Sequence, residues 1–342
     1  METCLETARF VSGSYGYHRN KGCHIIKRKK ILMLAPFWDG IGGAETFAKA
    51  LYEELSKVHE VQVVKSDFKR TWAGTGLGNF WTVFPQILKK SFWKARKVDI
   101  ILANGLISAT IGCILRFLRK NEVRVVLLAL YEFKGRSAIF RFLARQVLLR
   151  CEKVYVEGQN GAQDILDIFI PPSKIRIFNH WVDQDVFKPI ERTNKKLQVL
   201  FVGRPIQEKG IQIIKDIETK MRYIKNVEFT YVENVPYQNL PRYYQMADLL
   251  VVPSLYSEGF VRVVAEGASC GCVVIATNMG SLPEMVNPFG IIVPPPYALG
   301  FYLEIEKFYN GFYTLDLWRE ATIEYAKQNF SPKNAEVFLR EI

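Results

Sequence analysis

The feature that most constrains the fold is a series of short apolar segments that alternate with helical stretches. "ILMLAPF" follows a basic run and leads through a glycine-rich turn into an amphipathic helix from about residue 43. Further apolar segments lie at 60–65, 98–104, 123–130 and 153–158, and helical stretches include 106–120 and 136–150. Because these strands are apolar throughout, they predict a parallel sheet that is covered on both faces.

The pattern restarts after the polar segment "NHWVDQDVFKPIERTNKK", which contains Pro189. The second set of apolar segments lies at 197–203, 227–233, 247–254, 272–277 and 290–295. A chain of 342 residues also exceeds what one hydrophobic core usually serves. We therefore expect an α/β protein with two Rossmann-like, doubly wound domains that face each other across a cleft at the carboxyl ends of both sheets.

The expected domains are an N-terminal extension (1–24), an N-terminal Rossmann-like domain (25–188) and a C-terminal Rossmann-like domain (189–318). Residues 319–342 are expected to be helical, and we hypothesise that they cross back to the N-terminal domain. In "SPKNAEVFLREI", Ser331 is a candidate N-cap and Pro332 the first helical residue.

The net positive charge of the protein comes from the first half of the chain. Residues 1–150 contain 26 Lys+Arg and 11 Asp+Glu, whereas residues 151–342 contain 20 and 23. This asymmetry predicts an anionic partner for the first half: a membrane surface, a phosphorylated substrate or nucleic acid. The sequence has neither an apolar run of about 18 residues nor a signal-peptide core, and its six cysteines are scattered, so we expect a cytoplasmic protein.

Two acids stand out in the segment "SEGFVRVVAEGASCGCVVIATNMGSLPEMV". Glu258 and Gly259 follow an apolar strand, so they lie where α/β sheets bind ligands. Glu266 falls in the first turns of the following helix, where a carboxylate can accept the two adjacent hydroxyls of a ribose. The free N–H groups of a nearby helix N-terminus would suit a phosphate. The alternative is that Glu258 is a solvated loop acid and Glu266 an acid placed for the helix dipole.

The whole segment resembles the E-x7-E region of the retaining GT-B glycosyltransferases of family 4, the group 1 transferases. Glu258 and Glu266 occupy the two signature positions. Three other stretches are similar to motifs of this family in the same order: "GIGGAE", "NHWVDQDVFKP" and "FVGRPIQEKG". The resemblance implies a GT-B enzyme that moves a sugar from a nucleotide-diphosphate sugar, UDP- or GDP-linked, to an acceptor hydroxyl with retention of configuration.

The resemblance also implies roles for individual residues. Arg204 and Lys209 would hold the donor diphosphate, as two cations can do without a metal. Glu258 would face the donor sugar, and Glu266 would bind the ribose. The implied catalytic residues are Arg204, Lys209 and Glu258, and the implied donor site comprises Gly42, Gly43, Gly203, Arg204, Lys209, Glu258, Gly259, Phe260, Val263 and Glu266.

The sequence departs from the family on the sugar side. Where the family often has a histidine after the fourth strand of its first domain, this chain reads "LALYEFKG". Tyr131 or Glu132 stands in that place, and with Asn104 they are assigned to the sugar or acceptor side. Glu132 is a candidate base, with a surface acid as the alternative. Val261 and Val273 also replace a common glycine and proline.

Several other functions remain as alternatives. Asp183 and Asp185 form a D-x-D, which we assign to the linker rather than to a metal, and we expect neither a metal nor another cofactor. Cys270 and Cys272 are expected to be small buried residues rather than a metal pair. A nucleotide-sugar epimerase, a glycan phosphorylase and another GT-B enzyme are the enzymatic alternatives. A basic nucleic-acid-binding protein is the non-enzymatic alternative, although no known nucleic-acid-binding module is present, so we expect no nucleic acid.

The basic half also contains aromatic residues between cations. The segment 68–97 carries Trp72, Phe80, Trp81, Phe84, Phe92 and Trp93. "IGCILRFLRK" and "KGRSAIFRFLARQVLLR" read as basic amphipathic helices. This pattern is typical of peripheral membrane association, so the hypothesis is that the first domain binds a lipid-linked or membrane-proximal glycan. Internal packing of these aromatics is the alternative.

Overall fold

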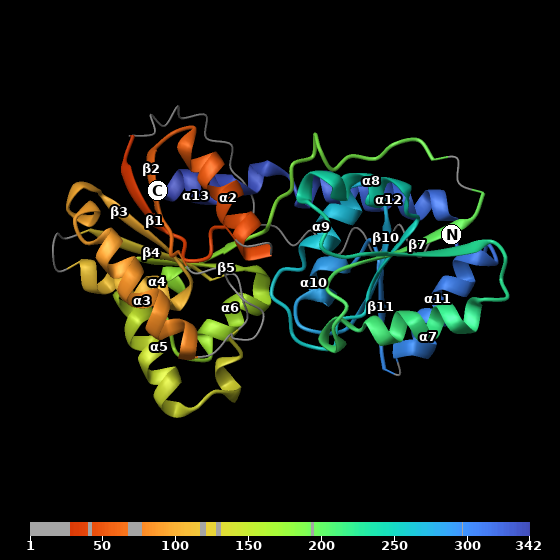
Figure 1. The fold of residues 1–342 in the computed structure, drawn as a ribbon, viewed down its shortest axis with the longest axis horizontal. Helices are drawn as coiled ribbons and strands as arrows, with labels where there is room; N and C mark the ends of the chain where they lie inside the picture. The colour runs from red at the N-terminus through yellow and green to blue at the C-terminus, as the bar shows by residue number, and fades with distance from the viewer. Residues whose placement is uncertain are drawn as a thin grey trace.

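The computed structural model describes residues 28–39, 43–67, 77–116, 121–127, 131–192, 195–295 and 297–342, and the side chains of 77–81 lie outside this description. Within it, the chain forms a six-stranded sheet followed by a five-stranded sheet, and every strand pairing is parallel (Figure 1). The expectation of two doubly wound α/β sheets is confirmed.

The first sheet has the strand order β2-β1-β3-β4-β5-β6. Its strands are β1 (Lys30–Leu34), β2 (Glu60–Val64), β3 (Ile100–Asn104), β4 (Glu122–Leu127), β5 (Lys153–Glu157) and β6 (Ile175–Phe178). Its helices are α2 (Gly43–Ser56), α3 (Leu77–Ser91), α4 (Gly105–Leu115), α5 (Ala138–Arg150) and α6 (Gly158–Leu166). Consecutive residues of β1 enter different hydrophobic clusters, because side chains alternate across a strand and both faces are covered.

The second sheet has the order β11-β10-β9-β7-β8. Its strands are β7 (Leu197–Val202), β8 (Val227–Val232), β9 (Leu249–Val252), β10 (Val273–Thr277) and β11 (Ile291–Val293). Its helices are α7 (Ile211–Met221), α8 (Leu240–Met246), α9 (Arg262–Ser269), α10 (Leu282–Val286), α11 (Tyr297–Tyr309) and α12 (Leu315–Asn329). Leu250 and Val252 pack into one cluster, and Leu249 and Val251 into another, so this sheet is also covered on both faces.

The end of the chain packs against the first sheet. Helix α13 (Glu336–Glu341) places Phe338 beside Tyr155 and Phe178, with ring centroids 4.6 and 5.0 Å away. Arg176 forms an ion pair with Glu341. Ser331 caps the 3-10 turn Pro332–Ala335 that precedes α13, rather than the α-helix that the sequence predicts. The residue limits of the domains stay predictions.

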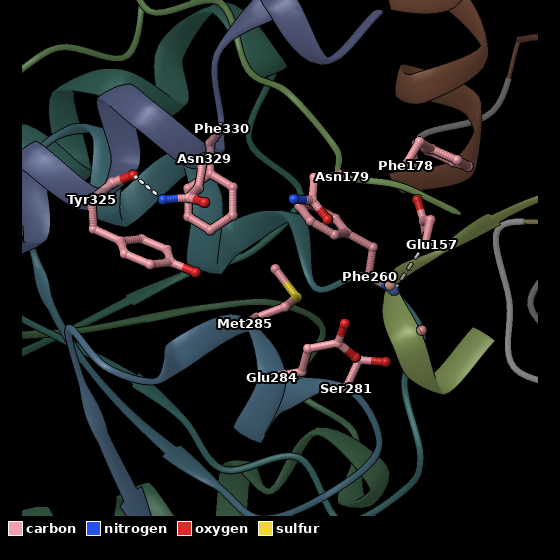
Figure 2. A pocket seen from close by; sticks show the side chains of 12 residues that line it. Glu157, Phe178, Asn179, Phe260, Ser281, Glu284, Met285, Tyr325, Asn329 and Phe330 are labelled. Carbon is pink, nitrogen blue, oxygen red and sulfur yellow. Dashed lines mark hydrogen bonds between the residues drawn. The ribbon is translucent and has the colours of Figure 1, made fainter. Parts of the chain in front are cut away.

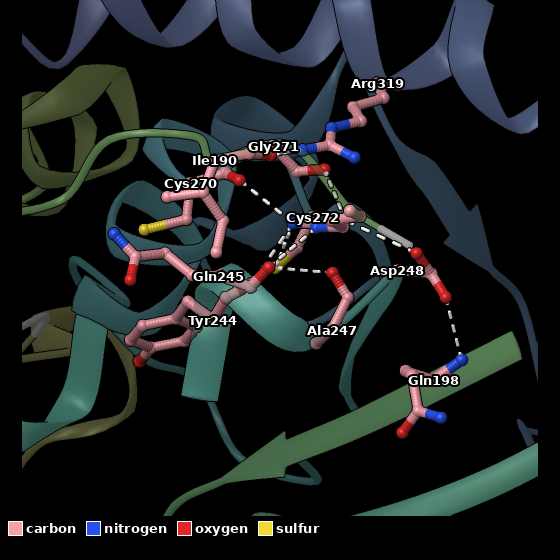
Figure 3. A network of polar contacts seen from close by, with 11 residues as sticks. Ile190, Gln198, Tyr244, Gln245, Ala247, Asp248, Cys270, Gly271, Cys272 and Arg319 are labelled. Atoms are coloured by element: carbon pink, nitrogen blue, oxygen red, sulfur yellow. Dashed lines mark hydrogen bonds and ion pairs between the residues drawn. The ribbon is translucent and has the colours of Figure 1, made fainter. Parts of the chain in front are cut away.

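A buried arginine ties the connecting segment to the second sheet. Arg192 donates to the carbonyl oxygens of Gln245 (2.7 Å) and Cys270 (2.9 Å), and its Nη1 lies 3.5 Å from Asp248. Figure 3 shows the residues gathered around this guanidinium. Cys272 is buried beside it, and burial raises the pKa of the Cys272 thiol to about 11. The network holds the chain at Arg192, a few residues before β7, against the last residues of α8 and the segments that follow α8 and α9.

Candidate functional site

The chain order reverses once in each sheet, between β1 and β3 and between β7 and β9. In doubly wound sheets, ligands bind outside the carboxyl ends of the strands at such switch points. Asn104 ends β3, and Gly43 begins the helix after β1. Gly203 directly follows β7, and the segment 253–261 follows β9. The residues predicted from the sequence therefore come from both switch points.

Lys209 and Glu258 contact each other directly. Nζ of Lys209 forms an ion pair with Oε2 of Glu258, while the hydroxyl of Ser254 donates to Oε1. The ring of Tyr256 lies 5.3 Å from Nζ of Lys209. Burial and then the charge of Glu258 raise the pKa of Tyr256, and the charge of Arg204 lowers it, so Arg204 acts on the same cluster. The pairing of Lys209 with Glu258 leaves the cation partly neutralised.

Two glycines allow the backbone around this cluster to pack closely. Gly210 has φ +72°, and a Cβ there would lie 2.0 Å from the carbonyl oxygen of Pro253. Gly280 has φ +55°, and a Cβ there would lie 2.4 Å from the carbonyl oxygen of Glu258. Because neither position accepts a side chain, the loop that carries Glu258 is held from both sides.

Glu266 is buried and is bound by two protein groups. The hydroxyl of Tyr244 donates to Oε2 (2.9 Å), and Nε of Arg262 donates to Oε1 (3.1 Å). A carboxylate has about four lone-pair directions, so two remain for hydroxyl donors. Val263, one residue beyond Arg262, packs partly buried against the core of the second sheet. Gly42 lies outside the described residues, whereas Gly43 is in contact range of Arg262 from the opposite domain.

Gly259 and Phe260 line a small open cavity, of about 40 Å³, between the domains (Figure 2). The backbone N–H of Phe260 donates to Oε2 of Glu157, at the carboxyl end of β5 (3.1 Å). The Phe260 ring stacks on His180, with centroids 4.0 Å apart. This cavity is lined by none of the predicted cations, but it adjoins the Lys209 and Glu258 cluster, because the N–H of Ser281 in its lining donates to the carbonyl oxygen of Glu258 at 3.0 Å.

Glu157 and His180 form a buried pair at this contact, with Oε1 and Nε2 2.8 Å apart. Burial raises the pKa of Glu157 well above its ordinary value. Burial, and then the charge of Arg262, lower the pKa of His180 well below its ordinary value. Both directions favour the uncharged forms of the two groups, and among the described residues Oε1 of Glu157 has no partner with hydrogen-bond geometry.

A second carboxylate joins the two domains. Glu284 on α10 accepts from the backbone N–H groups of Gln159 (2.6 Å) and Asn160 (3.3 Å), at the start of α6. Gly158 has φ +61°, and a Cβ there would lie 2.6 Å from Oε1 of Glu284. An acid from one domain thus caps a helix of the other, where the helix dipole favours negative charge.

The residues assigned to the sugar or acceptor side lie together on the first domain. The hydroxyl of Tyr131 accepts from the N–H of Leu106, two residues beyond Asn104, at 3.4 Å. Glu132 is exposed and has the left-handed φ of +49°. Asp164 on α6 holds this conformation by accepting from the backbone N–H groups of Tyr131, Glu132 and Phe133. The backbone of residues 131–133 is therefore held in place, although the side chain of Glu132 faces solvent.

Other predicted features pack structurally. Asp183 accepts from the backbone N–H groups of Asp185 and Val186, which makes it the cap of a turn. Within the described ranges, no group of three or more His, Cys, Asp or Glu is arranged to hold a metal ion. Phe84 and Phe92 pack against the core of the first sheet, whereas Trp93 is 66% exposed. Trp72 and the side chains of Phe80 and Trp81 lie outside the description.

The sequence predictions did not include Glu157, His180, Arg262 and Glu284. Each is a polar residue beside an apolar run, as in "KVYVEG" and "VRVVAEG", and this is the signal that could have marked it. Their partners lie in the other domain or one helical turn away, which no local pattern indicates.

Comparisons with known proteins show what the chain is similar to. Residues 184–328 match the model for "Glycosyl transferases group 1". An uncharacterized 41.2 kDa protein in the cps region of Klebsiella pneumoniae is 25% identical over 263 residues, which cover 65% of this chain and 71% of that protein. The O-antigen chain mannosyltransferase B of Escherichia coli is 42% identical over 65 residues, or 19% of this chain and 17% of that enzyme.

Solved structures with the same fold cover nearly the whole chain. Sucrose-phosphate synthase from Thermosynechococcus elongatus has a TM-score of 0.76 at 18% identity, over 92% of this chain and 98% of that one. The Anabaena protein HepE, solved with UDP and glucose, has a TM-score of 0.72 at 16% identity, over 92% and 99%. Residues 184–328 are thus similar to the group 1 glycosyl transferases, and the chain as a whole has the two-domain GT-B fold of these solved structures.

Proposed function

We propose that this protein transfers a sugar from a nucleotide-diphosphate sugar to an acceptor hydroxyl with retention of configuration. The observation that carries the proposal is the meeting of Lys209, Glu258 and Ser254 at the β7/β9 switch point, beside Arg204. Cations there would stabilise the charge that develops on a departing diphosphate. The HepE structure with UDP and glucose supports a nucleotide sugar as the donor.

The proposed reaction needs no protein nucleophile. The acceptor hydroxyl approaches the face that the diphosphate leaves, and the departing phosphate oxygen takes its proton. Lys209 and Arg204 bind that diphosphate, Glu258 orients the sugar, and Glu266 accepts the ribose hydroxyls. Positioning and charge stabilisation supply the rate enhancement, and the two cations replace a divalent metal.

The test is a reaction of the full chain with UDP-, GDP- and ADP-linked sugars and a panel of glycan acceptors. Free nucleoside diphosphate should appear only when donor and acceptor are both present, and proton NMR of the product should show the anomeric configuration of the donor. Release without acceptor would favour an epimerase or hydrolase, and an inverted product would refute retention.

We further propose that the acceptor is presented at an anionic membrane by α5. The first turns of α5 expose Ile139 (74%), Phe142 (59%) and Leu143 (57%), whereas Ala144 and Leu148 on the other side are buried. Lys134, Arg136, Arg141 and Arg145 lie around this apolar surface. Exposed apolar side chains among cations suit a bilayer with anionic headgroups.

Aromatic contacts connect this surface with the acceptor-side loop. Phe133 stacks between Tyr131 and Phe140, with ring centroids 5.3 and 6.0 Å away. In the described part of the chain, no helix has the length and apolar character needed to cross a bilayer. Contact through α5 would therefore place Tyr131 near an acceptor whose lipid stays in the membrane.

Co-sedimentation with vesicles tests the membrane proposal. The full chain should bind phosphatidylglycerol-containing vesicles more than pure phosphatidylcholine, and Phe142→Ser with Leu143→Ser should reduce that binding about tenfold or more, because two large apolar side chains no longer insert. Phe312→Ser is the matched control, since Phe312 is 76% exposed in the second half of the chain. Equal binding by both variants, or no preference for anionic vesicles, would contradict the proposal.

A further inference from the structure

Arg262 carries a buried donor that its contacts leave unused. It begins α9, and its side chain bends toward Glu266 one turn later. Nε donates to Glu266 at 3.1 Å, and Nη2 donates to the hydroxyl of Tyr237 at 2.9 Å. The residue is only 9% exposed, and among the described residues no acceptor lies within hydrogen-bond reach of Nη1.

An unpaired N–H on a buried guanidinium is unusual, because the group loses its water without a replacement acceptor. Arginine cannot lose its charge to relieve this cost. The planar fork of the guanidinium suits phosphate oxygens in particular. An acceptor that arrives with a ligand would satisfy Nη1, and an anionic acceptor would do so best.

The surroundings of Arg262 favour phosphate. The side chain reaches the opposite domain, where a Cβ on Gly43 would lie 3.4 Å from Cδ of Arg262. Gly43 is the first residue of the 14-residue helix α2, which follows β1 at the switch point of the first sheet. The first N–H groups of a helix have no partner within the helix and present positive charge. Two sources of positive potential from different domains therefore face the same space.

Arg262 also determines the state of Glu266. Its Nε occupies one oxygen of that carboxylate while Tyr244 occupies the other, so Glu266 is fixed in position before any ligand arrives. The pair balances its own charge, and Nη1 keeps its N–H groups without an acceptor, while the side chain lies against the first turn of α2, which also carries the buried carboxylate of Glu45. A ligand that places a ribose on Glu266 would bring its phosphates toward this donor.

We propose that Nη1 of Arg262 binds the diphosphate of the nucleotide donor and that Arg262 is a donor-binding residue beyond Arg204 and Lys209. This inference rests on the proposed function and adds a residue of the second domain that contacts the glycine of the first. It also assigns Arg262 to the diphosphate rather than to the nucleoside.

The experiment is isothermal titration of the full chain with a nucleoside diphosphate and with its parent nucleoside, using the base that the wild type binds most tightly. Arg262→Met should weaken diphosphate binding about tenfold more than it weakens nucleoside binding, because the nucleoside loses only the support that Nε gives Glu266, whereas the diphosphate also loses a charge-assisted hydrogen bond. Equal losses for both ligands, or no loss for either, would overturn the inference.

Two further variants keep the test decisive. Arg262→Lys retains a charge beside Glu266 but removes Nη1, so it should fold normally and lose diphosphate affinity by about threefold or more; full wild-type affinity would overturn the inference. Arg242→Met is the matched control, because Arg242 is exposed and also stacks on a tyrosine, and its diphosphate affinity should stay within about twofold. If the wild type binds the diphosphate and Arg262→Met binds it equally well, the inference fails alone; if the wild type does not bind the diphosphate, the proposed function fails with it.

Discussion

Replacing Glu157 tests the protonation state that joins the two domains. In the structure Glu157 accepts from the N–H of Phe260 and lies 2.8 Å from Nε2 of His180. Glutamine has nearly the same size, carries no charge, and has an oxygen that can accept from the N–H of Phe260 as Glu157 does. We expect Glu157→Gln to change the free energy of unfolding by about 1 kcal/mol or less at about pH 4, where the wild-type carboxyl is protonated in both the folded and the unfolded state.

Alanine at the same position removes both contacts. It leaves the Phe260 N–H buried without its acceptor, so Glu157→Ala should cost about 1–3 kcal/mol. Urea unfolding followed by tryptophan fluorescence measures both variants. The comparison uses the first transition, in which contacts between domains are lost, because two domains can unfold in separate steps.

The protonation state of Glu157 determines how the stability of each variant changes with pH. The raised pKa of Glu157 means that the folded state keeps a proton that the unfolded carboxyl loses above pH of about 4.5. Its contribution to wild-type stability is therefore complete below that pH and is lost as pH rises toward the folded pKa. Glutamine has no such loss, so the stability of Glu157→Gln relative to wild type should rise with pH, by at most about 1.4 kcal/mol per unit.

The lowered pKa of His180 works in the opposite direction, since its contribution is present above pH of about 6.5 and is lost as pH falls. His180 makes this contribution in both wild type and Glu157→Gln. The difference between their free energies of unfolding therefore reports on the Glu157 carboxyl group. If glutamine is as destabilising as alanine and its deficit grows with pH, the pair is an imidazolium and a carboxylate, and the reasoning is refuted.

Further predictions concern the linker, the cations, the thiols and metals. Arg192→Met should lower the free energy of unfolding by about 3–5 kcal/mol, because it leaves Asp248 and several carbonyl oxygens without their donor. Arg222→Met, at an exposed position, should cost less than about 0.5 kcal/mol. Similar urea midpoints for the two variants would contradict this. Lys209→Ala should weaken binding of nucleoside diphosphate about tenfold or more, as judged by titration calorimetry. Cys272, with its pKa raised to about 11, should react with iodoacetamide at pH 8 only after unfolding, and rapid alkylation of the native chain would oppose the assigned burial. Transfer activity should persist in EDTA, and a loss that Mg²⁺ or Mn²⁺ restores would refute metal independence.

The fold could be predicted from the sequence because its strands are buried on both faces and are therefore continuously apolar. Strand β6 was missed because it has only four residues, includes Arg176 and lies at the edge of its sheet. The predicted strand 247–254 is longer than β9, since Pro253 and Ser254 are buried but lie past the end of the strand at Val252. The length of an apolar run indicates burial, and burial extends beyond the hydrogen-bonded strand.

The candidate site was predictable only in part. The positions of Glu258 and Glu266 after β9 and on α9 follow from local pattern. The ion pair of Lys209 with Glu258 joins residues from two loops at one switch point, and the contact of Arg262 with Gly43 depends on how the two domains meet. Such contacts depend on tertiary arrangement, which the periodicity of a single segment does not encode.

The most direct test of the central claim is a thermal-shift measurement of the full chain with UDP, GDP and ADP and with their sugars. A ligand that binds only the folded state raises the melting temperature, by an amount that grows with its concentration relative to Kd. We predict a clear rise with at least one of these ligands that Glu266→Ala and Lys209→Ala both reduce. No rise with any ligand at millimolar concentration, or a rise that both variants retain in full, would contradict a nucleotide-sugar site at Lys209, Glu258 and Glu266.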